Sequence, residues 1–444
     1  MINPAPGPKY SPLALNLIRF RRDPLSFLQW LTKQYGDFAR FWMGGQQMFF
    51  VNHPDYIRDV LVTYNSNFVK GRALQRAKRL LGQGLLTSEG DLHRRQRLLV
   101  QPAFHRQRIA SYGSVMVEHA DRTSSRWRDG DTFDMSQEMT RLTLGIVAKT
   151  LFDADVESEA DQIGEAMTCI MQMFNLLMFP FAEMLEKLPL PQIRRYHRMH
   201  ARLDSIIYRI IDERRRSGED RGDLLSMLLL AQDEEGGSGG MSDTQVRDEA
   251  LTLFLAGHET TANALSWSWY LLSQHPEVER KMYAELNEKL HARLPTIEDV
   301  PHLPYTEMVV AESIRLYPPA WAIGRRALVE QTIGSYVVPA NSIVLLSPFV
   351  THRDARFFPE PARFDPDRWT PEAKQSRPQY CYFPFGGGPR RCVGESFAWA
   401  EAILVLATLA SRWKAHLVPG NKVAPNALIT LRPKHGVPVT IERR

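Results

Sequence analysis

FGGGPRRCVG, from Phe385 to Gly394, places one cysteine, Cys392, among glycines and two arginines. An apolar run with helix-compatible composition follows from Phe397 to Leu409. Glycine lets a backbone approach a large flat group closely, and a helix N-terminus lowers the pKa of a nearby thiol. Because a thiolate is one of the axial ligands of haem iron, the stretch favours an iron ligand over the alternative, an inert buried cysteine.

The composition is that of a globular protein, with 444 residues of which 44% are apolar and 24% charged. Three cysteines without a CxxC pair argue against a disulfide framework or a zinc ribbon and favour a reducing compartment. The net charge of +5 and the lack of a dense basic run give no reason to expect nucleic acid. No signal-peptide core or bilayer-long apolar stretch is present. We therefore expect a soluble, cytoplasmic protein without a transmembrane anchor.

Helical patterns dominate the chain. They predict a helix from Pro24 to about Tyr35, a mainly helical region over 111–232 and a long helix from Ser242 to about Ser273. Apolar runs around Gly44-Gly45 predict a β-hairpin over 38–51.

The glycine-rich segment 234–240 joins helices inside a helical region and does not separate two cores. We expect one domain over 1–444, mainly α with small β-sheets (α+β). Its β-rich parts fall at about 37–52, 323–347 and 415–442.

The long predicted helix contains AGHETT. Ala256 and Thr260 are spaced i,i+4 and share a face, and Gly257 lets a flat ligand approach. Thr260 is expected to bond back to the carbonyl one turn earlier, and Glu259 supplies an acid. The motif favours proton transfer to a bound oxygen species, and the alternative is an ordinary core helix with a solvent-facing glutamate.

His258-Glu259 does not start a zinc motif, because position 262 is alanine where HExxH needs a second histidine. We expect His258 to point away from the site.

Glu312 and Arg315 are spaced i,i+3, which permits a contact on one face of a helix. A solvated surface pair is the common alternative. Arg368 lies further on, in the irregular stretch FDPDRW.

Together these residues resemble the cytochrome P-450 superfamily, the haem-thiolate monooxygenases. FGGGPRRCVG matches the cysteine signature FxxGxRxCxG at every fixed position, including Gly388 and Gly394. AGHETT matches the oxygen-activation motif, Glu312-Ser313-Ile314-Arg315 the ExxR motif, and FDPDRW the meander motif. The four motifs occur in the family's order and at about its spacing, and the resemblance covers essentially the whole chain.

The resemblance implies haem b held between the long helix and the helix after the cysteine loop. Cys392 becomes the axial thiolate ligand, with Phe385 beside the sulfur, and Ala256 and Gly257 contact the cofactor. Glu312, Arg315 and Arg368 become a buried triad that holds the cysteine loop in place.

The resemblance also implies groups that bind the haem propionates. Arg390 and Arg325 take that role. Many relatives carry a Trp-x-x-x-Arg pair, and here His93 replaces the tryptophan four residues before Arg97. A surface histidine is the alternative for His93.

In the implied reaction one atom of O2 enters a C–H or C=C bond of an apolar small molecule, with Thr260 and Glu259 delivering protons. Electrons come from NAD(P)H through a separate ferredoxin or flavodoxin with its reductase, since we expect no fused redox domain. Arg94, Arg95 and Arg391 are candidates for the docking face, with ordinary solvated arginines as the equal alternative. The protein is expected to be a monomer.

By position in the family, the substrate pocket draws on residues 70–86, 167–181, 253–260, 319–323 and 427–430. Its apolar candidates are Leu85, Leu86, Phe174, Leu177, Phe254, Trp321, Leu428 and Ile429. A fatty acid and a terpenoid are the substrate candidates, and the residues do not separate them. Arg72, Arg76 and Arg79 offer a carboxylate contact, although a basic surface loop is the simpler interpretation.

The alternatives for function are a peroxide-driven hydroxylase, a rearrangement enzyme that needs no electrons, a non-catalytic haem-binding protein, and a haem-free protein. Thr260 and Glu259 argue against the first two.

Overall fold

The longest helix of the computed structural model, α12 (Asp243–Gln274), begins at a reciprocal side-chain cap. Ser242 Oγ accepts the Gln245 N–H at 3.3 Å, and Gln245 Oε1 accepts the Ser242 N–H at 3.0 Å. The helix starts and stops within one residue of the bounds that the sequence predicts.

The structure describes residues 5–10, 15–154, 160–177, 190–230 and 241–444.

The chain forms two compact units. Unit 1 comprises residues 1–75, 311–392 and 425–432, and unit 2 comprises 76–310, 393–424 and 433–444. Two helices run from one unit into the other, α4 (Arg72–Leu81) and α14 (Pro304–Leu316). The single domain expected from the sequence stays a prediction.

Unit 1 is built on a five-stranded sheet of order β1-β2-β8-β5-β3. β1 and β2 form the predicted hairpin, with Met43 paired to Gln46 across the Gly-Gly turn. β2 pairs with β8 in parallel, and β5 is antiparallel to both β8 and β3. The strands of this sheet are β1 (Phe38–Met43), β2 (Gln46–Val51), β3 (Phe68–Lys70), β5 (Ile323–Ala327) and β8 (Ile343–Leu346).

Both faces of this sheet are buried. On β2, Phe50 packs in one apolar cluster with Leu28 and Leu31 of α2, whereas its neighbours Phe49 and Val51 pack in another with Ile57 and Leu61. This alternation follows from the two-residue period of a strand. The remaining elements of unit 1 are α1 (Leu15–Arg22), α2 (Pro24–Tyr35), α3 (Pro54–Arg58), the π-helix η1 (Asp59–Thr63), η2 (Asn65–Asn67), β6 (Gln331–Ile333), β7 (Tyr336–Val338), α15 (Pro348–Thr351), η6 (Pro366–Trp369), α16 (Pro371–Gln375), η7 (Gly388–Arg390), β10 (Pro425–Ala427) and β11 (Leu431–Pro433).

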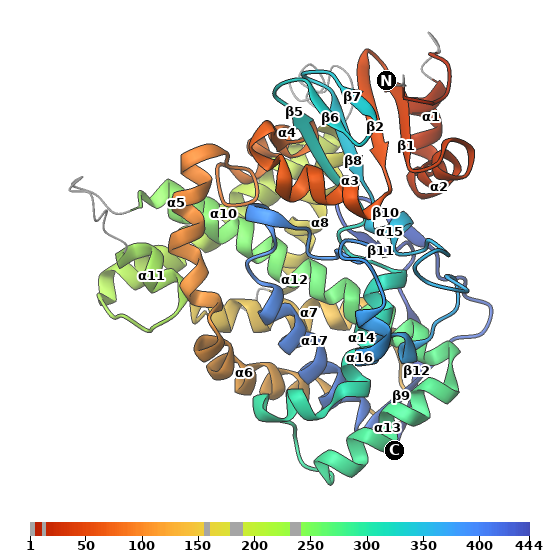
Figure 1. Ribbon diagram of the computed structural model, residues 1–444. Coiled ribbons are helices and arrows are strands. Elements are labelled where there is room, and N and C mark those ends of the chain that lie inside the picture. Colours follow the sequence, from red (N-terminus) through yellow and green to blue (C-terminus); the bar gives the residue numbers. More distant parts are fainter. Residues whose placement is uncertain (1–4, 11–14, 155–159, 178–189, 231–240) are drawn as a thin grey trace. The chain divides into compact units, whose positions relative to one another are not determined.

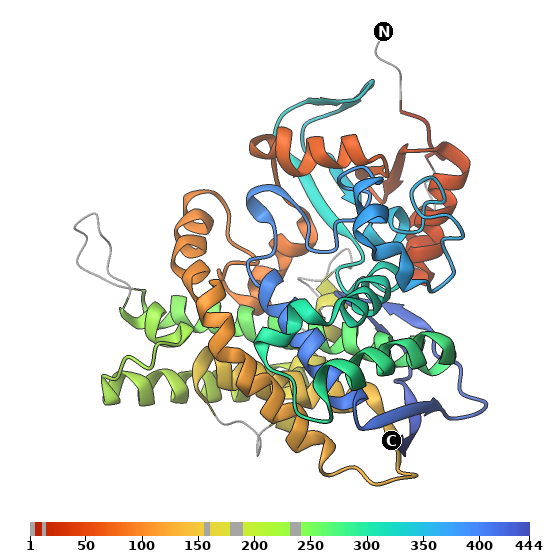
Figure 2. The same ribbon diagram turned by 60° about the horizontal axis from the view of Figure 1, so that its bottom comes forward.

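Unit 2 is mainly helical. α12 packs against α7 and α17, and α17 packs against α6 (Figures 1 and 2). α17 is apolar on almost every side and is buried from Ala400 to Ala410, as a helix without a polar face requires. Its helices and strands are α5 (Gly90–Val100), η3 (Gln101–Phe104), α6 (Arg106–Ser124), β4 (Thr132–Asp134), α7 (Met135–Phe152), α8 (Ala160–Leu177), α10 (Pro191–Ser217), α11 (Leu224–Leu230), α12, α13 (Pro276–Leu290), η5 (Ile297–His302), α17 (Glu395–Ala410), β9 (Trp413–Leu417) and β12 (Pro438–Arg443).

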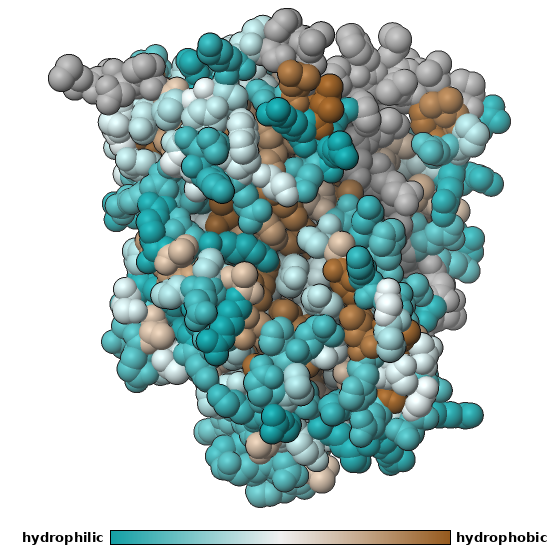
Figure 3. Space-filling view, turned by 90° about the vertical axis from the view of Figure 1, so that its right-hand side faces the viewer, coloured by the Kyte–Doolittle hydropathy of each residue, from teal (hydrophilic) through white to brown (hydrophobic). Residues whose placement is uncertain are grey.

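The mainly helical architecture with small sheets confirms the predicted fold class. Hydrophilic side chains cover most of the face shown in Figure 3, and hydrophobic ones appear among them in groups. Within the described ranges, no helix combines the length and the apolarity that crossing a bilayer demands.

Candidate active site

The loop around Cys392 is closed by backbone hydrogen bonds. The Cys392 N–H donates to Phe385 O at 3.0 Å, and the Arg391 N–H donates to Gly388 O at 3.0 Å. The next helix, α17, begins at Glu395 with Gly394 as its N-cap. The cysteine therefore lies just before a helix N-terminus, as the sequence predicts, on a turn whose ends are fixed.

Cys392 differs from the other two cysteines in exposure. Its residue is exposed, whereas Cys169 and Cys381 are buried. Burial raises the pKa of the Cys381 thiol to about 11 and raises that of Cys169. Those two remain protonated thiols at neutral pH, so Cys392 is the cysteine that can offer a thiolate to a bound group.

Gly388 owes its identity to the protein backbone. Its φ is +64°, and an added Cβ would lie 2.0 Å from Leu61 O. Any side chain there would push the cysteine loop away from η1. The sequence attributes the loop glycines to the approach of a flat ligand, and at Gly388 the structure gives a different physical reason.

On α12, a strip of small side chains interrupts a buried helix. Ala256 is exposed, and Gly257 and Thr260 are half-buried, while nearly all residues from Val246 to Trp269 are buried. Thr260 Oγ1 donates to Ala256 O at 2.6 Å, the back-bond that the sequence predicts. The helix remains continuous there.

The acid beside Thr260 is buried. Glu259 is 8% exposed, which excludes the solvent-facing glutamate of the alternative interpretation. Asn263 Nδ2 donates to Glu259 Oε1 at 3.2 Å and to Glu259 O at 2.8 Å. The carboxylate is therefore steadied by a side chain one turn further along the same helix.

The two residues before Glu259 pack closely with other parts of unit 2. His258 Nδ1 lies 2.6 Å from Phe254 O, and burial lowers the pKa of this imidazole. An added Cβ at Gly257 would meet Val147 Cγ2 at 2.9 Å. Gly257 thus permits close packing against α7, and its predicted contact with the cofactor remains a prediction.

Glu312 and Arg315 form a fully buried ion pair. Arg315 Nε donates to Glu312 Oε2 at 2.7 Å, and Arg315 Nη2 donates to Oε1 at 2.8 Å; both side chains are 0% exposed. Arg368 Nε lies 3.4 Å from Glu312 Oε1. The structure thus brings together the three residues that the sequence groups, and it excludes the solvated surface pair.

This ion pair organises the irregular segment before the cysteine loop. Arg315 donates to the carbonyls of three residues at 2.8–3.1 Å, namely His352, Pro361 and Arg363. Glu312 accepts the Asp365 N–H at 3.0 Å and the Trp369 Nε1–H at 2.9 Å. The role of Trp369 was not predicted from the sequence, although this residue stands in the motif FDPDRW next to Arg368.

His352 is a further residue without a sequence signal. Its side chain is buried, and its Nε2 accepts the Phe383 N–H at 3.0 Å, two residues before the cysteine loop begins. Burial, followed by the charges of Arg315 and Arg353, holds the pKa of this imidazole well below its ordinary value. A neutral His352 thus links the ion pair to the start of the loop.

Comparison with known proteins identifies the family. The sequence model of the cytochrome P450 family matches residues 5–437. The chain belongs to the cytochrome P450 family. It is a haem-thiolate monooxygenase that uses O2.

Three similar proteins are bacterial. Cyclooctatin synthase of Streptomyces melanosporofaciens is 41% identical over 95% of this chain and 92% of its own length. Cyclooctat-9-en-7-ol 5-monooxygenase of the same organism is 39% identical over 94% and 90%. Pentalenene oxygenase of Streptomyces avermitilis is 35% identical over 96% and 94%.

Each unit of this cytochrome P450 offers side chains of the kinds that hold a haem. Unit 1 offers the exposed Cys392 thiol with the half-buried Arg390 and Arg325, and the last donates to Gly324 O at 3.1 Å. Unit 2 offers the open strip on α12 and, one turn apart on α5, the buried His93 and the half-buried Arg97. A sulfur donor, a small-residue strip and cationic side chains suit the iron, the flat ring and the propionates, respectively.

Two pocket candidates of unit 1 touch. Trp321 is buried, and its Nε1–H donates to Leu428 O at 2.8 Å. Leu428 and Ile429 are half-buried. The indole thereby fixes the short segment between β10 and β11.

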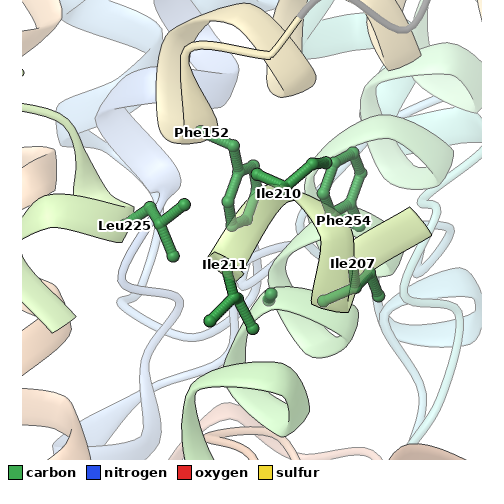
Figure 4. A pocket seen from close by; sticks show the side chains of 7 residues that line it. Phe152, Ile207, Ile210, Ile211, Leu225 and Phe254 are labelled. Atoms are coloured by element: carbon green, nitrogen blue, oxygen red, sulfur yellow. The ribbon is translucent and has the colours of Figure 1, made fainter. Parts of the chain in front are cut away.

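The predicted substrate-pocket residues of unit 2 differ in their surroundings. Leu85 is buried and Leu86 half-buried in the segment between α4 and α5. The Phe254 ring stacks on Phe152 at 4.4 Å between centroids, in an apolar pocket too narrow for a water molecule (Figure 4). The side chains of Phe174 and Leu177 lie outside the described residues.

Proposed function

We propose that this cytochrome P450 oxidises an apolar terpenoid with electrons from NAD(P)H. A separate ferredoxin or flavodoxin with its reductase delivers these electrons. The names of two relatives give their substrates as an alkenol and an alkene, and these support a terpenoid over a fatty acid. Within unit 2, the apolar side chains of the buried Leu85 and the half-buried Leu86 suit such a substrate.

Each site residue has a proposed role. Cys392 ligates the haem iron, with Phe385 closing its loop, and His93, Arg97, Arg325 and Arg390 bind the propionates. When bound, the haem activates O2 for insertion of one oxygen atom into a C–H or C=C bond. Thr260, held by Ala256 O, orders water and passes protons that Glu259 supplies. The enzyme acts as a monomeric, single-domain protein of the cytoplasm.

The observation that carries this proposal is the exposed Cys392 thiol on a loop closed by the Cys392 N–H to Phe385 O hydrogen bond. The test is the absorption spectrum of the reduced protein under carbon monoxide. Wild type, Cys169→Ala and Cys381→Ala should show the strongly red-shifted Soret band of a thiolate-ligated haem, and Cys392→Ala should not. A wild-type band without that shift overturns the assignment of the ligand.

The substrate and the electron source need separate tests. A screen of terpenoids and fatty acids for the spin-state shift of the Soret band compares the two substrate classes, and a shift produced only by fatty acids contradicts the proposal. Turnover with peroxide that exceeds turnover with NAD(P)H and redox partners would favour a peroxide-driven hydroxylase.

A further inference from the structure

The segment that follows α4 is held against α12 by two consecutive buried acids. Asp248 Oδ2 accepts the Gln83 N–H at 2.7 Å, and Glu249 Oε2 accepts the Leu85 N–H at 2.9 Å. Asp248 is 7% exposed and Glu249 is 0% exposed. Burying a carboxylate is costly unless it is well bonded, so these two hydrogen bonds are strong constraints on residues 82–88.

Two glycines allow this close approach. An added Cβ at Gly82, whose φ is +68°, would lie 2.1 Å from Asp248 Cγ. An added Cβ at Gly84 would lie 2.2 Å from Thr252 Oγ1 and 2.5 Å from Asp248 O. The backbone of residues 82–84 therefore lies directly on α12.

The segment is also braced from within and from α5. Thr87 Oγ1 donates to Gly82 O at 2.7 Å, and the Thr87 and Ser88 N–H groups donate to Gly84 O at 2.9 and 3.0 Å. Gln96 Nε2 donates to Gln83 O at 2.6 Å. Residues 82–88 therefore have one well-defined conformation, and the acids of α12 fix where it lies.

The same face of α12 leads to the proposed reaction site. Glu249, Thr252, Ala256 and Thr260 follow one another at spacings of three, four and four residues, which places them in one stripe along the helix. Glu249 and Ala256 are seven residues apart, or about 10 Å along the axis. A small apolar substrate is long enough to span that distance.

We propose that Glu249 and Asp248 are positioning residues for the oxidation. They hold Leu85 and Leu86 at a set distance along α12 from Ala256 and Thr260, and so determine how tightly an apolar molecule binds and which of its atoms is oxidised. The inference rests on the proposed function, in which the α12 strip faces the haem. Two carboxylates that lie outside the four sequence motifs thereby contribute to the enzyme's substrate specificity.

The test compares Glu249→Ala with Glu249→Gln, which keeps an acceptor for the Leu85 N–H. Two azoles serve as probes, because both bind haem iron through nitrogen: 4-phenylimidazole, whose ring needs the pocket, and imidazole, which does not. In Glu249→Ala we expect the Kd for 4-phenylimidazole to rise about tenfold, equivalent to 1.4 kcal/mol, and the Kd for imidazole to stay unchanged. Glu249→Gln should restore most of the affinity. An equal Kd for 4-phenylimidazole in Glu249→Ala and wild type overturns the proposal.

Amide hydrogen exchange gives a second readout that needs no ligand. Residues 83–88 should exchange faster in Glu249→Ala, while α17 should not change. The exposed acid Glu277 provides the matched control as Glu277→Ala, with wild-type binding and exchange. Unchanged exchange at residues 83–88 in Glu249→Ala contradicts the proposed restraint.

The outcomes separate this proposal from the proposed function. Loss of the thiolate Soret band in wild type contradicts the function, whereas a normal band with unchanged azole binding in Glu249→Ala contradicts only the positioning role. If Glu249→Ala yields no haem-loaded protein, Thr87→Val removes the bond to Gly82 O without leaving a buried charge. Thr87→Val should raise the Kd for 4-phenylimidazole by about threefold and leave the Kd for imidazole unchanged. Equal Kd values for 4-phenylimidazole in Thr87→Val and wild type would again overturn the proposal.

Discussion

His352 Nε2 accepts the backbone N–H of Phe383 at 3.0 Å inside the core of unit 1. The bond ties the segment that Arg315 organises to the chain just before Phe385. Neither residue belongs to a recognised motif. The contact stabilises the start of the cysteine loop, and it becomes visible only in the folded structure.

Replacing this histidine should weaken unit 1. His352→Leu leaves the buried Phe383 N–H without an acceptor, and we expect the free energy of unfolding to fall by about 1–3 kcal/mol. Urea unfolding measures the loss. The exposed His435 supplies the control as His435→Leu, which should unfold like wild type, and equal midpoints for all three proteins would contradict a supporting role for His352.

The imidazole also predicts acid sensitivity. Burial keeps the pKa of His352 well below 6.5, so the folded protein holds it neutral where the unfolded chain takes up a proton. The stability from this group is present above about pH 6.5 and is lost as the pH falls below that value. Between pH 7 and pH 5, His352→Leu should therefore lose less stability than wild type, as urea midpoints would show.

Arg315→Lys should be severely destabilising. Lysine keeps the charge but cannot serve Glu312 and three carbonyls at once, and disrupting a buried ion pair costs about 3–5 kcal/mol. We expect little haem-loaded protein, measured as the ratio of Soret to 280 nm absorbance. Arg363→Ala is the matched control, because Arg315 contacts only the carbonyl of Arg363, whose own side chain is 64% exposed. A haem content in Arg315→Lys equal to that of Arg363→Ala would refute this view.

Thr260→Ala should separate electron use from product formation. Without the hydroxyl that Ala256 O holds, proton delivery loses its relay, and product formation should fall by roughly 10²-fold while hydrogen peroxide is released. Product and peroxide per NAD(P)H consumed are the measurements, with a ferredoxin and its reductase supplied. Thr244→Ala, at an exposed position of α12, should stay fully coupled. Tight coupling in Thr260→Ala would remove Thr260 from the proton path.

Glu401 predicts a loss of stability toward alkaline pH. It is 0% exposed on α17, and burial raises the pKa of its carboxyl from 4.5 to about 8. The folded protein holds the neutral acid, so stability is fully present below about pH 4.5 and is lost as the pH rises through about 8. Glu401→Gln should remove this loss and be more stable than wild type at pH 8.5, by on the order of 2 kcal/mol.

Thermal or urea unfolding at pH 5 and pH 8.5 tests this prediction. The exposed Glu277 gives the control as Glu277→Gln, which should follow wild type at both pH values. Parallel pH profiles for wild type and Glu401→Gln would mean that the buried carboxyl titrates normally.

Local sequence patterns predicted the helices and strands themselves better than they predicted which strands pair with each other. The Gly44-Gly45 turn between apolar runs indicates the β1–β2 hairpin, because both strands are adjacent in sequence. The parallel pairing of β2 with β8 joins residues almost 300 positions apart, such as Met48 and Ile343, and leaves no local signal. Sheet order therefore required the structure.

The site shows the same division. Spacing alone suggests the Glu312–Arg315 contact and the Thr260 back-bond, since both lie within one helical turn. The Leu85 N–H bond to Glu249 crosses 164 residues and depends on how the chain folds. Motifs also named Gly388 and Gly257 without the reason for them, which is the nearness of Leu61 O and Val147.

The hydrogen bonds that Arg315 makes to backbone carbonyls have a consequence for sequence variation among homologous proteins. Its guanidinium holds His352, Pro361 and Arg363 only by their carbonyl oxygens, which every amino acid provides. Exposed positions of this segment are thus free to exchange side chains without altering the restraint, so homologous proteins can diverge there while the path of the chain toward the cysteine stays the same.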